Sequence, residues 1–460
     1  MLFNSLQFLV FFGVVTLSYY SLGWRGRWVM LLMASCYFYM VFKPEYILIL
    51  AVTIIIDYIA GIWIEQSEGK KRKHILILSL VSNVGFLAFF KYFNFLGQNF
   101  NKLLPAALEL PYLSILLPIG LSFHTFQAMS YTIEVYRGNQ KAERHFGIYA
   151  LYVMFYPQLV AGPIERPQNL LPQFHSYFKY DWENIKAGLA QIAWGFFKKL
   201  VIADRLAMVV DYSYDAPEYF NGMTLLTATF FFTFQIYCDF SGYSDIAIGS
   251  ARVMGFKLMQ NFDQPYISKS ISEFWRRWHI SLSTWFRDYL YIPLGGNRKS
   301  EYRVYFNLFL VFAISGLWHG AKWTFVIWGS LHGLYLIVAQ WRDNHLKIKQ
   351  KLPDFIQLII TFFLVMLTWV FFRASGTTYA FIILKKIFTL HFTEAIASPL
   401  NSIEMWFSVV LVGLMFAKEK YLPVIPTVKN TSFWMWLGGL VACCYFLGVF
   451  SSNQFIYFQF

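Results

Sequence analysis

The stretch YILILAVTIIIDYIAGIWI, residues 46–64, carries a single charged residue, Asp57, among apolar and aromatic neighbours. A helix that crosses the hydrocarbon core of a bilayer needs about 20 predominantly apolar residues, so this stretch is predicted to span a membrane. Comparable runs lie at residues 6–22, 355–372 and 434–450. The same criterion predicts roughly ten to twelve crossings over the chain. We therefore expect an all-α, polytopic membrane protein.

The composition agrees with a membrane protein. Of the 460 residues, 57% are hydrophobic and only 14% are charged, which is too few charges to cover a soluble protein of this length. No long polar stretch is available for a separate soluble domain. We expect one integral-membrane domain, 1–460, with N-terminal helices (1–161), a polar centre with interfacial helices (162–305), and C-terminal helices with a tail (306–460).

The net charge of +13 is spread over short loops. WRGRW (24–28) and EGKKRKH (68–74) are basic, and the positive-inside rule predicts that both loops are cytoplasmic and that the N-terminus lies outside. The opening residues MLFNSLQ lack the basic region of a cleavable signal peptide. Because the positive charge is dispersed between membrane segments, it does not indicate nucleic-acid binding.

Several common sites are missing from the sequence. The four cysteines, Cys36, Cys238, Cys443 and Cys444, have neither disulfide-framework nor zinc-site spacing. The chain also lacks a G-x-S-x-G elbow, a P-loop and an H-E-x-x-H pattern. We therefore expect no metal site and no bound cofactor.

The block ISEFWRRWHISLSTWFRDYLYIPLGGNRK, residues 271–299, has helical periodicity. Its apolar stripe is Ile271, Phe274, Trp275, Trp278, Leu282, Trp285, Phe286 and Tyr289. These spacings predict one helix along the membrane surface that ends before Pro293. His279 falls on the buried stripe, where a polar group is costly unless it has a partner. Its role is either catalytic or that of a hydrogen-bonded core histidine.

A second histidine interrupts the apolar run at 311–338 with the polar sequence WHGAKW. His319 lies at this interruption, and Gly320 allows the backbone to bend there. An ionisable group at membrane depth indicates a functional site, so His319 is the stronger candidate. His332 lies in a smoother helical pattern and is assigned to packing. Asp239 and Asp245 are expected to be buried acids in a second polar interruption, YCDFSGYSD.

An imidazole beside basic residues suits acyl transfer. Histidine can accept the proton of an attacking hydroxyl because much of it is neutral at cellular pH. Cations near the cytoplasmic surface can bind the phosphates of acetyl-CoA or an acidic acyl carrier protein. The candidate donor-binding residues are Arg276, Arg277, Arg287, Arg298 and Lys299. Their alternative role is to set orientation by the positive-inside rule.

Three long runs carry a family resemblance: YCDFSGYSDIAIGSARVMGF (237–256), NFDQPYISKSISEFWRRWHISLSTWFRDYLYIPLGGN (261–297) and SGLWHGAKWTFVIWGSLHG (315–333). They resemble the membrane-bound O-acyltransferase (MBOAT) superfamily, and most closely its bacterial branch that acylates alginate, peptidoglycan and related cell-envelope polymers. The resemblance implies a ring of helices around a thinned centre, with re-entrant and interfacial helices. It also implies that His319 is the catalytic histidine and that His279 assists it.

The same resemblance implies a location and partners. The expected location is the bacterial inner membrane. The expected donor is acetyl-CoA or an acyl-carrier thioester on the cytoplasmic side. The expected acceptor is an extracytoplasmic polysaccharide, reached through an SGNH-hydrolase-like acetyltransferase.

The last six residues, FIYFQF (455–460), resemble the F-x-Y-F-x-F acyl relay of this branch. The hydroxyl of Tyr457 would carry the acyl group in transit. Tyrosine ionises near pH 10, against about 15.7 for water, so a tyrosyl ester can pass its acyl group downhill to a sugar hydroxyl. The alternative is a tail that is merely buried in lipid or in a partner.

Other functions remain open at this point. A D-alanyl donor with teichoic acid as the acceptor would suit the same residues. A transporter or flippase would also have many helices with charges at mid-membrane, but it would more often show repeated halves. A non-catalytic scaffold of a polysaccharide export complex would tolerate the loss of both histidines.

Overall fold

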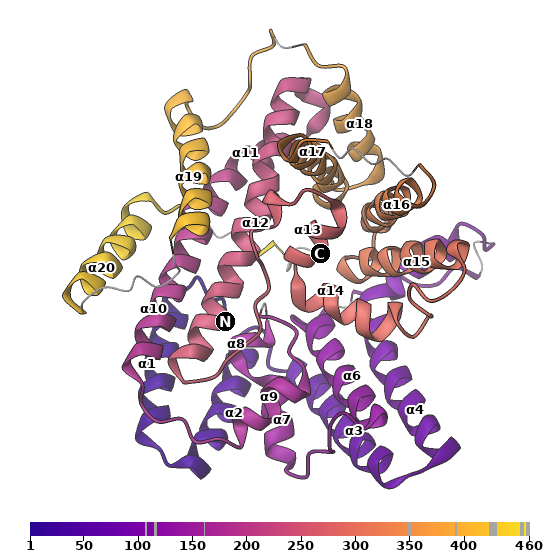
Figure 1. Ribbon diagram of the computed structural model, residues 1–460, viewed down its shortest axis with the longest axis vertical. Helices are drawn as coiled ribbons and strands as arrows, with labels where there is room; N and C mark the ends of the chain where they lie inside the picture. The colour runs from indigo at the N-terminus through magenta and orange to yellow at the C-terminus, as the bar shows by residue number, and fades with distance from the viewer. Residues whose placement is uncertain are drawn as a thin grey trace. The chain divides into compact units, whose positions relative to one another are not determined.

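The computed structural model describes residues 1–105, 108–114, 117–160, 162–346, 352–391, 393–422, 430–450 and 455–456. Every regular element within these ranges is helical, as Figure 1 shows. The predicted all-α class is confirmed.

Contacts divide the chain into two compact units. The first contains Met1–Ile192 and Ser244–Met259, and the second contains Ala193–Tyr243 and Gln260–Phe460. The predicted single acyltransferase domain, with its divisions at residues 162 and 306, stays a prediction.

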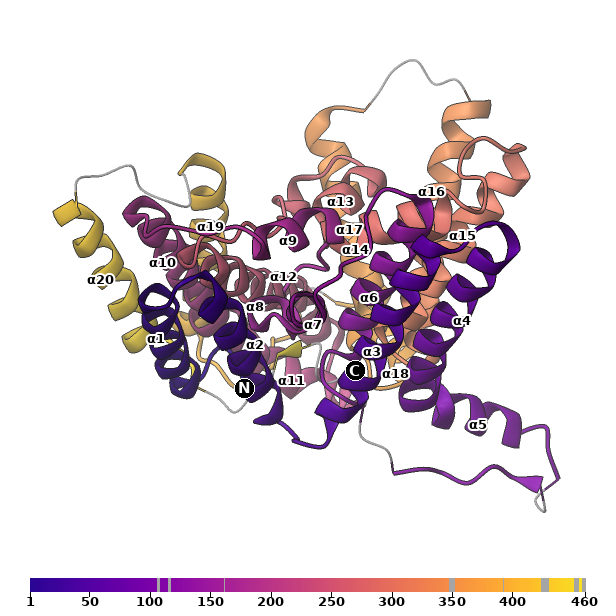
Figure 2. The same ribbon diagram turned by 90° about the horizontal axis from the view of Figure 1, so that it is seen from below.

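The first unit is a bundle of helices with a short extension. Its elements are α1 (Leu6–Ser21), α2 (Trp24–Met40), α3 (Tyr46–Gln66), α4 (Gly69–Leu87), η1 (Ala88–Tyr92), α5 (Phe93–Asn101), α6 (Leu121–Arg137), α7 (Phe146–Met154), α8 (Tyr156–Leu159) and α9 (Pro167–Phe174), with most of α10 (Trp182–Phe196). Helices α3, α4 and α6 pack against one another, and α2 packs on α7. The α5 segment leads away from α3, α4 and α6 (Figure 2).

A buried acid inside this bundle is paired with polar residues of the next helix. Asp57 on α3 is fully buried. It accepts hydrogen bonds from Ser79 Oγ at 2.6 Å and from Asn83 Nδ2 at 2.9 Å, both on α4. Because a carboxylate at membrane depth is costly without donors, these bonds explain how α3 tolerates a charged residue in its apolar run.

The second unit holds the two candidate histidines. Its elements are η3 (Phe197–Ala203), α11 (Asp204–Tyr214), η4 (Pro217–Tyr219), most of α12 (Gly222–Val253), η5 (Pro265–Ile267), α13 (Ile271–Arg277), α14 (Ile280–Phe286), η6 (Arg287–Tyr291), α15 (Glu301–His319), α16 (Trp323–His345), α17 (Asp354–Arg373), α18 (Thr377–Phe388), α19 (Ser402–Tyr421) and α20 (Asn430–Leu447).

Helices α15 and α16 form a tight antiparallel hairpin (Figure 1). Two glycines make the close approach possible. A Cβ atom at Gly316 would lie 2.2 Å from the carbonyl oxygen of Phe325, and one at Gly329 would lie 2.2 Å from that of Phe312. No side chain fits at such distances, so glycine is required where these two backbones meet.

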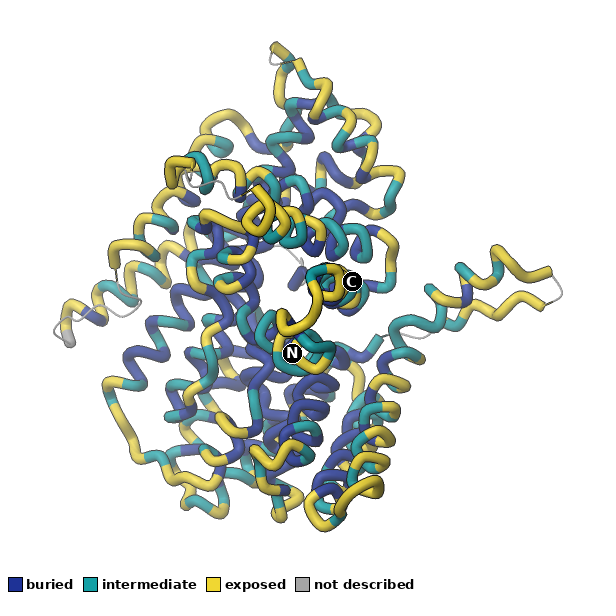
Figure 3. The backbone as a smooth tube through the Cα atoms, turned by 45° about the vertical axis from the view of Figure 1, so that its right-hand side comes forward, coloured by how far each residue is buried: buried dark blue, intermediate teal, exposed yellow. Residues whose placement is uncertain are grey.

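Large apolar side chains remain exposed on helices of both units. On α1 they include Leu6, Val10 and Leu17, and on α19 they include Ile403 and Trp406. Figure 3 shows such exposed stretches alternating with buried ones along many helices. Exposed apolar faces of this extent suit contact with lipid, where water is absent.

Three helical stretches in the described residues are long and apolar enough to cross a membrane: Tyr46–Gln66, Gly69–Asn101 and Asp354–Arg373. Two shorter apolar helices are Leu6–Ser21 and Thr431–Leu447. These helices support a multi-pass membrane protein. The larger number of crossings, and the external N-terminus, stay predictions.

The single helix predicted over the 271–289 stripe is wrong. The chain forms α13 and α14 instead, and they are separated by Trp278 and His279. His279 has a φ of 42°, in the left-handed region that ends a right-handed helix. The expectation that Asp245 is buried also needs correction, because this residue is only half-buried and its carboxylate accepts a hydrogen bond from Gln191.

Candidate active site

His279 lies at the break between α13 and α14, and its side chain is fully buried. Non-glycine residues rarely adopt a positive φ, and such residues cluster at functional sites. The break turns the imidazole toward aromatic rings of the same unit. Phe240 of α12 meets it edge-on, with ring centroids 4.6 Å apart.

Asn261 fixes the orientation of the His279 ring. Nδ1 of His279 lies 3.0 Å from Oδ1 of Asn261. The backbone N–H and the hydroxyl of Ser281 donate to the same oxygen, at 3.3 and 2.9 Å. A backbone N–H can only donate, so the shared atom is the amide oxygen and Nδ1 of His279 must carry a proton. The lone pair of His279 is therefore on Nε2.

Burial also affects the basicity of His279, which lies outside the three long membrane-spanning stretches. Desolvation lowers its pKa to about 3, so the imidazole is neutral at cellular pH. With its proton held at Nδ1, this neutral imidazole presents Nε2 as a hydrogen-bond acceptor.

His319 is the last residue of α15, and only 4% of it is exposed. The helix ends where the sequence predicted an interruption, and α16 begins at Trp323. The tight hairpin brings His319 beside Trp328 of α16, with ring centroids 5.0 Å apart, and Phe372 of α17 lies at 5.5 Å. Its position is thus set by three helices.

The two histidines lie together. Their ring centroids are 6.4 Å apart, and the ring planes are inclined at 60°. They come from different elements and are 40 positions apart in the sequence. Two buried imidazoles at this separation, walled by aromatic rings, can move one proton within the site.

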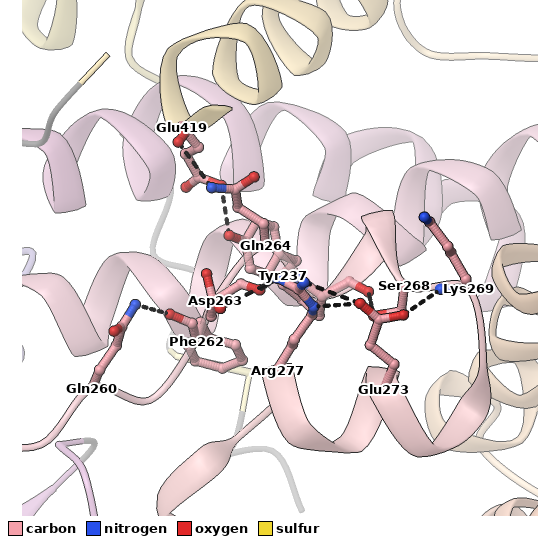
Figure 4. Close-up of polar contacts among 11 residues, drawn as sticks. Tyr237, Gln260, Phe262, Asp263, Gln264, Ser268, Lys269, Glu273, Arg277 and Glu419 are labelled. Carbon is pink, nitrogen blue, oxygen red and sulfur yellow. Dashed lines mark hydrogen bonds and ion pairs between the residues drawn. The ribbon is translucent and has the colours of Figure 1, made fainter. Parts of the chain in front are cut away.

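The loop that carries Asn261 is tied down by polar contacts (Figure 4). Arg277 of α13 pairs with Glu273 at 3.0 Å and with Asp263 at 3.2 Å. At the other side of the loop, Gln264 donates to the backbone carbonyl of Glu419 at 2.9 Å. Arg277, a candidate for donor binding, is thus engaged in holding this loop against α13.

Two other donor-binding candidates line a cavity of about 430 Å³. Arg276 of α13 and Arg287 of η6 are exposed and lie along its wall. Apolar side chains such as Leu308 and Phe312 line most of the rest, with Ser315 of α15 among them. Ser315 is one helical turn before His319, so the cavity reaches the helix that ends in the candidate base.

The remaining predicted residues lie elsewhere or outside the described chain. Arg298 and Lys299 are exposed in the segment before α15 and do not line this cavity. Tyr457 lies outside the described residues. Phe455 and Ile456, just before it, are described, and both are buried in the second unit, at 0% and 3% exposure.

His332 has the packing role that its smooth helical pattern indicated. Its Nδ1 accepts a hydrogen bond from the indole N–H of Trp275 at 3.2 Å. Nε2 lies 3.0 Å from Oγ1 of Thr368. A histidine with both ring nitrogens satisfied ties α13, α16 and α17 together and positions Trp275, which lines the cavity.

Asn261 was not identified from the sequence. It lies in the quoted run NFDQPYISKS, and only the contact with His279 across 18 positions reveals its role. The available signal was weak: a carboxamide between Gln260 and Phe262, shortly before a histidine-bearing block. Among the residues that the structure describes, no group of His, Cys, Asp or Glu is arranged to hold a metal ion.

Comparison with known sequences adds a second line of information. The sequence pattern of the MBOAT, membrane-bound O-acyltransferase family, matches residues 139–377. This region contains both histidines and all of the candidate donor-binding residues.

Three relatives illustrate the range of similarity. The chain is 41% identical to a probable alginate O-acetylase AlgI of Pseudomonas aeruginosa, over 85% of this chain and 75% of that protein. It is 35% identical to a peptidoglycan O-acetyltransferase of Helicobacter pylori, over 100% of this chain and 98% of that protein. A teichoic acid D-alanyltransferase of Streptococcus thermophilus is 30% identical over 49% of this chain and 57% of its own length.

Proposed function

The chain belongs to the membrane-bound O-acyltransferase family, and from that premise we propose that it passes an acetyl group from a cytoplasmic thioester across the membrane for O-acetylation of an extracytoplasmic polysaccharide. Membership makes it a multi-pass membrane O-acyltransferase. The names of the relatives favour acetyl as the acyl group and an alginate or peptidoglycan polymer as the acceptor. The structural observation that carries the proposal is the buried pair of His279 and His319, 6.4 Å apart.

The finer architecture is part of the same proposal. Roughly ten to twelve crossings would form a ring around a thinned centre in the bacterial inner membrane. Such a centre would let a donor on one side and an acceptor on the other reach the same histidines. The short helices α13 and α14, neither long enough to span a bilayer, suit the interfacial part of this arrangement.

In the first step, the hydroxyl of Tyr457 attacks the carbonyl carbon of the thioester. The new carbon–oxygen bond forms as the carbon–sulfur bond breaks. His319 takes the phenol proton and returns it to the departing sulfur, so a free thiol leaves. His279 is the assisting histidine: Asn261 holds its Nδ1 proton, which leaves Nε2 to accept a hydrogen bond from a group in the site.

In the second step, the acetyl group leaves the tyrosine. A hydroxyl of the extracytoplasmic acetyltransferase, which we expect to be SGNH-hydrolase-like, attacks the tyrosyl ester. The bond to the phenol oxygen breaks, and the proton of the attacking hydroxyl returns to the phenol. That partner then transfers the acetyl group to the polysaccharide, so the chain is regenerated after each cycle.

The donor side is assigned to the cavity beside α15. Arg276 and Arg287 would bind the phosphates of acetyl-CoA or of an acyl carrier protein, while the apolar wall accepts the thioester arm. Arg298 and Lys299, exposed nearby in sequence, would add to the positive potential that attracts the donor. Arg277 is the least suited of the five, because Glu273 and Asp263 already neutralise it.

The D-alanyl alternative is less favoured. The similarity to the teichoic acid D-alanyltransferase covers about half of this chain, whereas that to the two O-acetylating proteins covers 85% or more.

Replacing the candidate base also tests the scaffold alternative, because a non-catalytic chain would not need His319.

We predict that His319→Ala lowers the ester content of the polymer by about a hundredfold or more, the usual loss when a general base is removed. Protein abundance in membranes should stay normal. His345→Ala is the matched control, because His345 is an exposed histidine at the end of α16 that pairs with Glu301 at the start of α15. The measurement is acetyl released by mild alkali from polymer of cells that express each variant. Normal acetylation with His319→Ala would exclude the proposed base.

A further inference from the structure

A charged cluster lies in the second unit, outside the pair of histidines. Lys199 of η3 pairs with Asp204 at 2.7 Å and with Asp239 of α12 at 2.6 Å. All three residues are 2% exposed. The proposed acyl transfer uses none of them, so the cluster needs another explanation.

The cluster holds two carboxylates against one ammonium group. Buried charges are costly unless each is matched by a partner, and one ammonium cannot fully satisfy two carboxylates. The deficit is met in part by the C-terminal segment. The backbone N–H of Ile456 donates to Oδ2 of Asp239 at 2.8 Å, while Oδ1 faces Lys199. Hydrogen bonds to an ionised acceptor are among the stronger ones in proteins.

The residue before this bond is seated on aromatic rings of α12. Phe455 stacks on Tyr243, with centroids 4.3 Å apart, and lies 5.6 Å from Phe240. Phe240 is the ring that meets His279 edge-on. The docked segment is therefore separated from the active-site histidine by one aromatic side chain.

The segment is also held farther upstream. The N–H of Val449 donates to the carbonyl of Leu200 at 2.9 Å, and Arg205 donates to the carbonyl of Leu447 at 2.8 Å. Both acceptor and donor lie on η3 or α11, beside the charged cluster. The chain thus leaves α20 along the same two elements that carry Lys199 and Asp204.

We propose that Lys199, Asp204 and Asp239 form a docking site for the C-terminal segment of the chain, and that Asp239 is a positioning residue for acyl transfer through Tyr457. This inference rests on the proposed function. Tyr457 follows Ile456 directly in the sequence, so the hydrogen bond from the N–H of Ile456 to Asp239 anchors the chain one residue before Tyr457. Holding a nucleophile near its base raises the rate by lowering the entropy cost of their encounter.

The test removes one hydrogen bond and leaves the cluster intact. Proline has no backbone N–H, so Ile456→Pro deletes the donor to Asp239 without touching any charged residue. Ile456→Val keeps the N–H and serves as the matched control. The readout is the fraction of the C-terminal peptide that carries an acyl ester on Tyr457, measured by mass spectrometry of the full-length protein purified from cells. Relative to Ile456→Val, Ile456→Pro should lower this fraction about ten- to a hundredfold, as expected for a hydrogen bond to a charged group.

A second variant changes the acceptor of the same hydrogen bond. Asp239→Asn keeps the shape of the side chain but removes its charge, and it should also lower the fraction of esterified Tyr457. A second readout separates docking from general stability. In detergent, carboxypeptidase should digest the C-terminal residues faster in both Ile456→Pro and Asp239→Asn than in Ile456→Val, while thermal unfolding of Ile456→Pro stays close to that of Ile456→Val.

The outcomes separate this inference from the proposed function. An esterified Tyr457 at equal levels in Ile456→Pro and Ile456→Val overturns the docking site and leaves the relay standing. Full polymer acetylation with Tyr457→Phe overturns the relay itself, and with it the positioning role of Asp239. Low ester and fast digestion in both Ile456→Pro and Asp239→Asn support the inference.

Discussion

At the scale of single residues, the active site contains two imidazoles that are held in place by different neighbours. His279 is held by Asn261 through Nδ1 and is so deeply desolvated that its pKa falls to about 3. His319 ends a helix and is placed by contacts with Trp328 and Phe372. The two imidazoles are therefore oriented by different partners, and the family resemblance assigns the base to His319, a division of roles that composition alone does not reveal.

Replacing Asn261 tests this division. Asn261→Leu has a similar size but removes the oxygen that accepts from His279 and from the N–H and hydroxyl of Ser281. Buried donors without acceptors cost about 1–3 kcal/mol each, so we expect lower thermal stability and a loss of polymer acetylation of roughly ten- to a hundredfold.

Asn261→Asp is the control, because a carboxylate still accepts from His279 and Ser281. It should retain more acetylation than Asn261→Leu. Acetyl content of the polymer and the unfolding temperature in detergent are the two measurements. Equal acetylation in the Leu variant and the unmodified protein would contradict the positioning role assigned to Asn261.

At the scale of elements, the broken helix α13–α14 is what the sequence pattern could not predict. Its apolar stripe was identified correctly from Ile271 to Phe286, and these side chains are buried. One left-handed residue at His279 interrupts the hydrogen-bond ladder while later apolar residues still return to the core, so helical periodicity survives the break. The α15–α16 hairpin was easier, because WHGAKW marks the point where α15 ends.

The two short elements α13 and η6 present Arg276 and Arg287 to the cavity, and this placement predicts a donor effect. The double variant Arg276→Glu/Arg287→Glu should raise the KM for the donor by about tenfold, because each exposed charge contributes only weakly to binding. The effect on kcat should be smaller, because these arginines would bind the donor equally in the ground state and in the transition state. Arg342→Glu on α16, another exposed arginine, is the matched control.

Initial rates in membrane vesicles at varied concentrations of labelled acetyl-CoA give both constants. The alternative role of these arginines is to set orientation, so a tag on the N-terminus should be tested for accessibility in the same vesicles. An unchanged KM together with an inverted N-terminus would assign the arginines to topology instead of donor binding.

At the scale of the whole chain, the class of the protein was predictable from the sequence, but the buried polar contacts between distant residues were not. Long apolar runs with few charges indicate a membrane protein of helices from composition alone, and the matched histidine motifs indicate the family. The contacts of Asp239 with Lys199 and with Ile456 join residues 40 and 217 positions apart, and no local pattern predicts such pairs. Buried polar clusters form wherever the fold brings their members together, which periodicity does not describe.

The most direct test of acyl transfer through Tyr457 is the mass of the C-terminal peptide that contains this residue, from protein purified out of cells that make the acetylated polymer. We predict an ester on Tyr457, removed by mild alkali, in the unmodified protein, and none in His319→Ala. In Tyr457→Phe we predict neither the ester nor acetylated polymer, although this change keeps the size and apolar character of the side chain. Fully acetylated polymer in Tyr457→Phe, with no ester on the unmodified peptide, would contradict the tyrosyl relay.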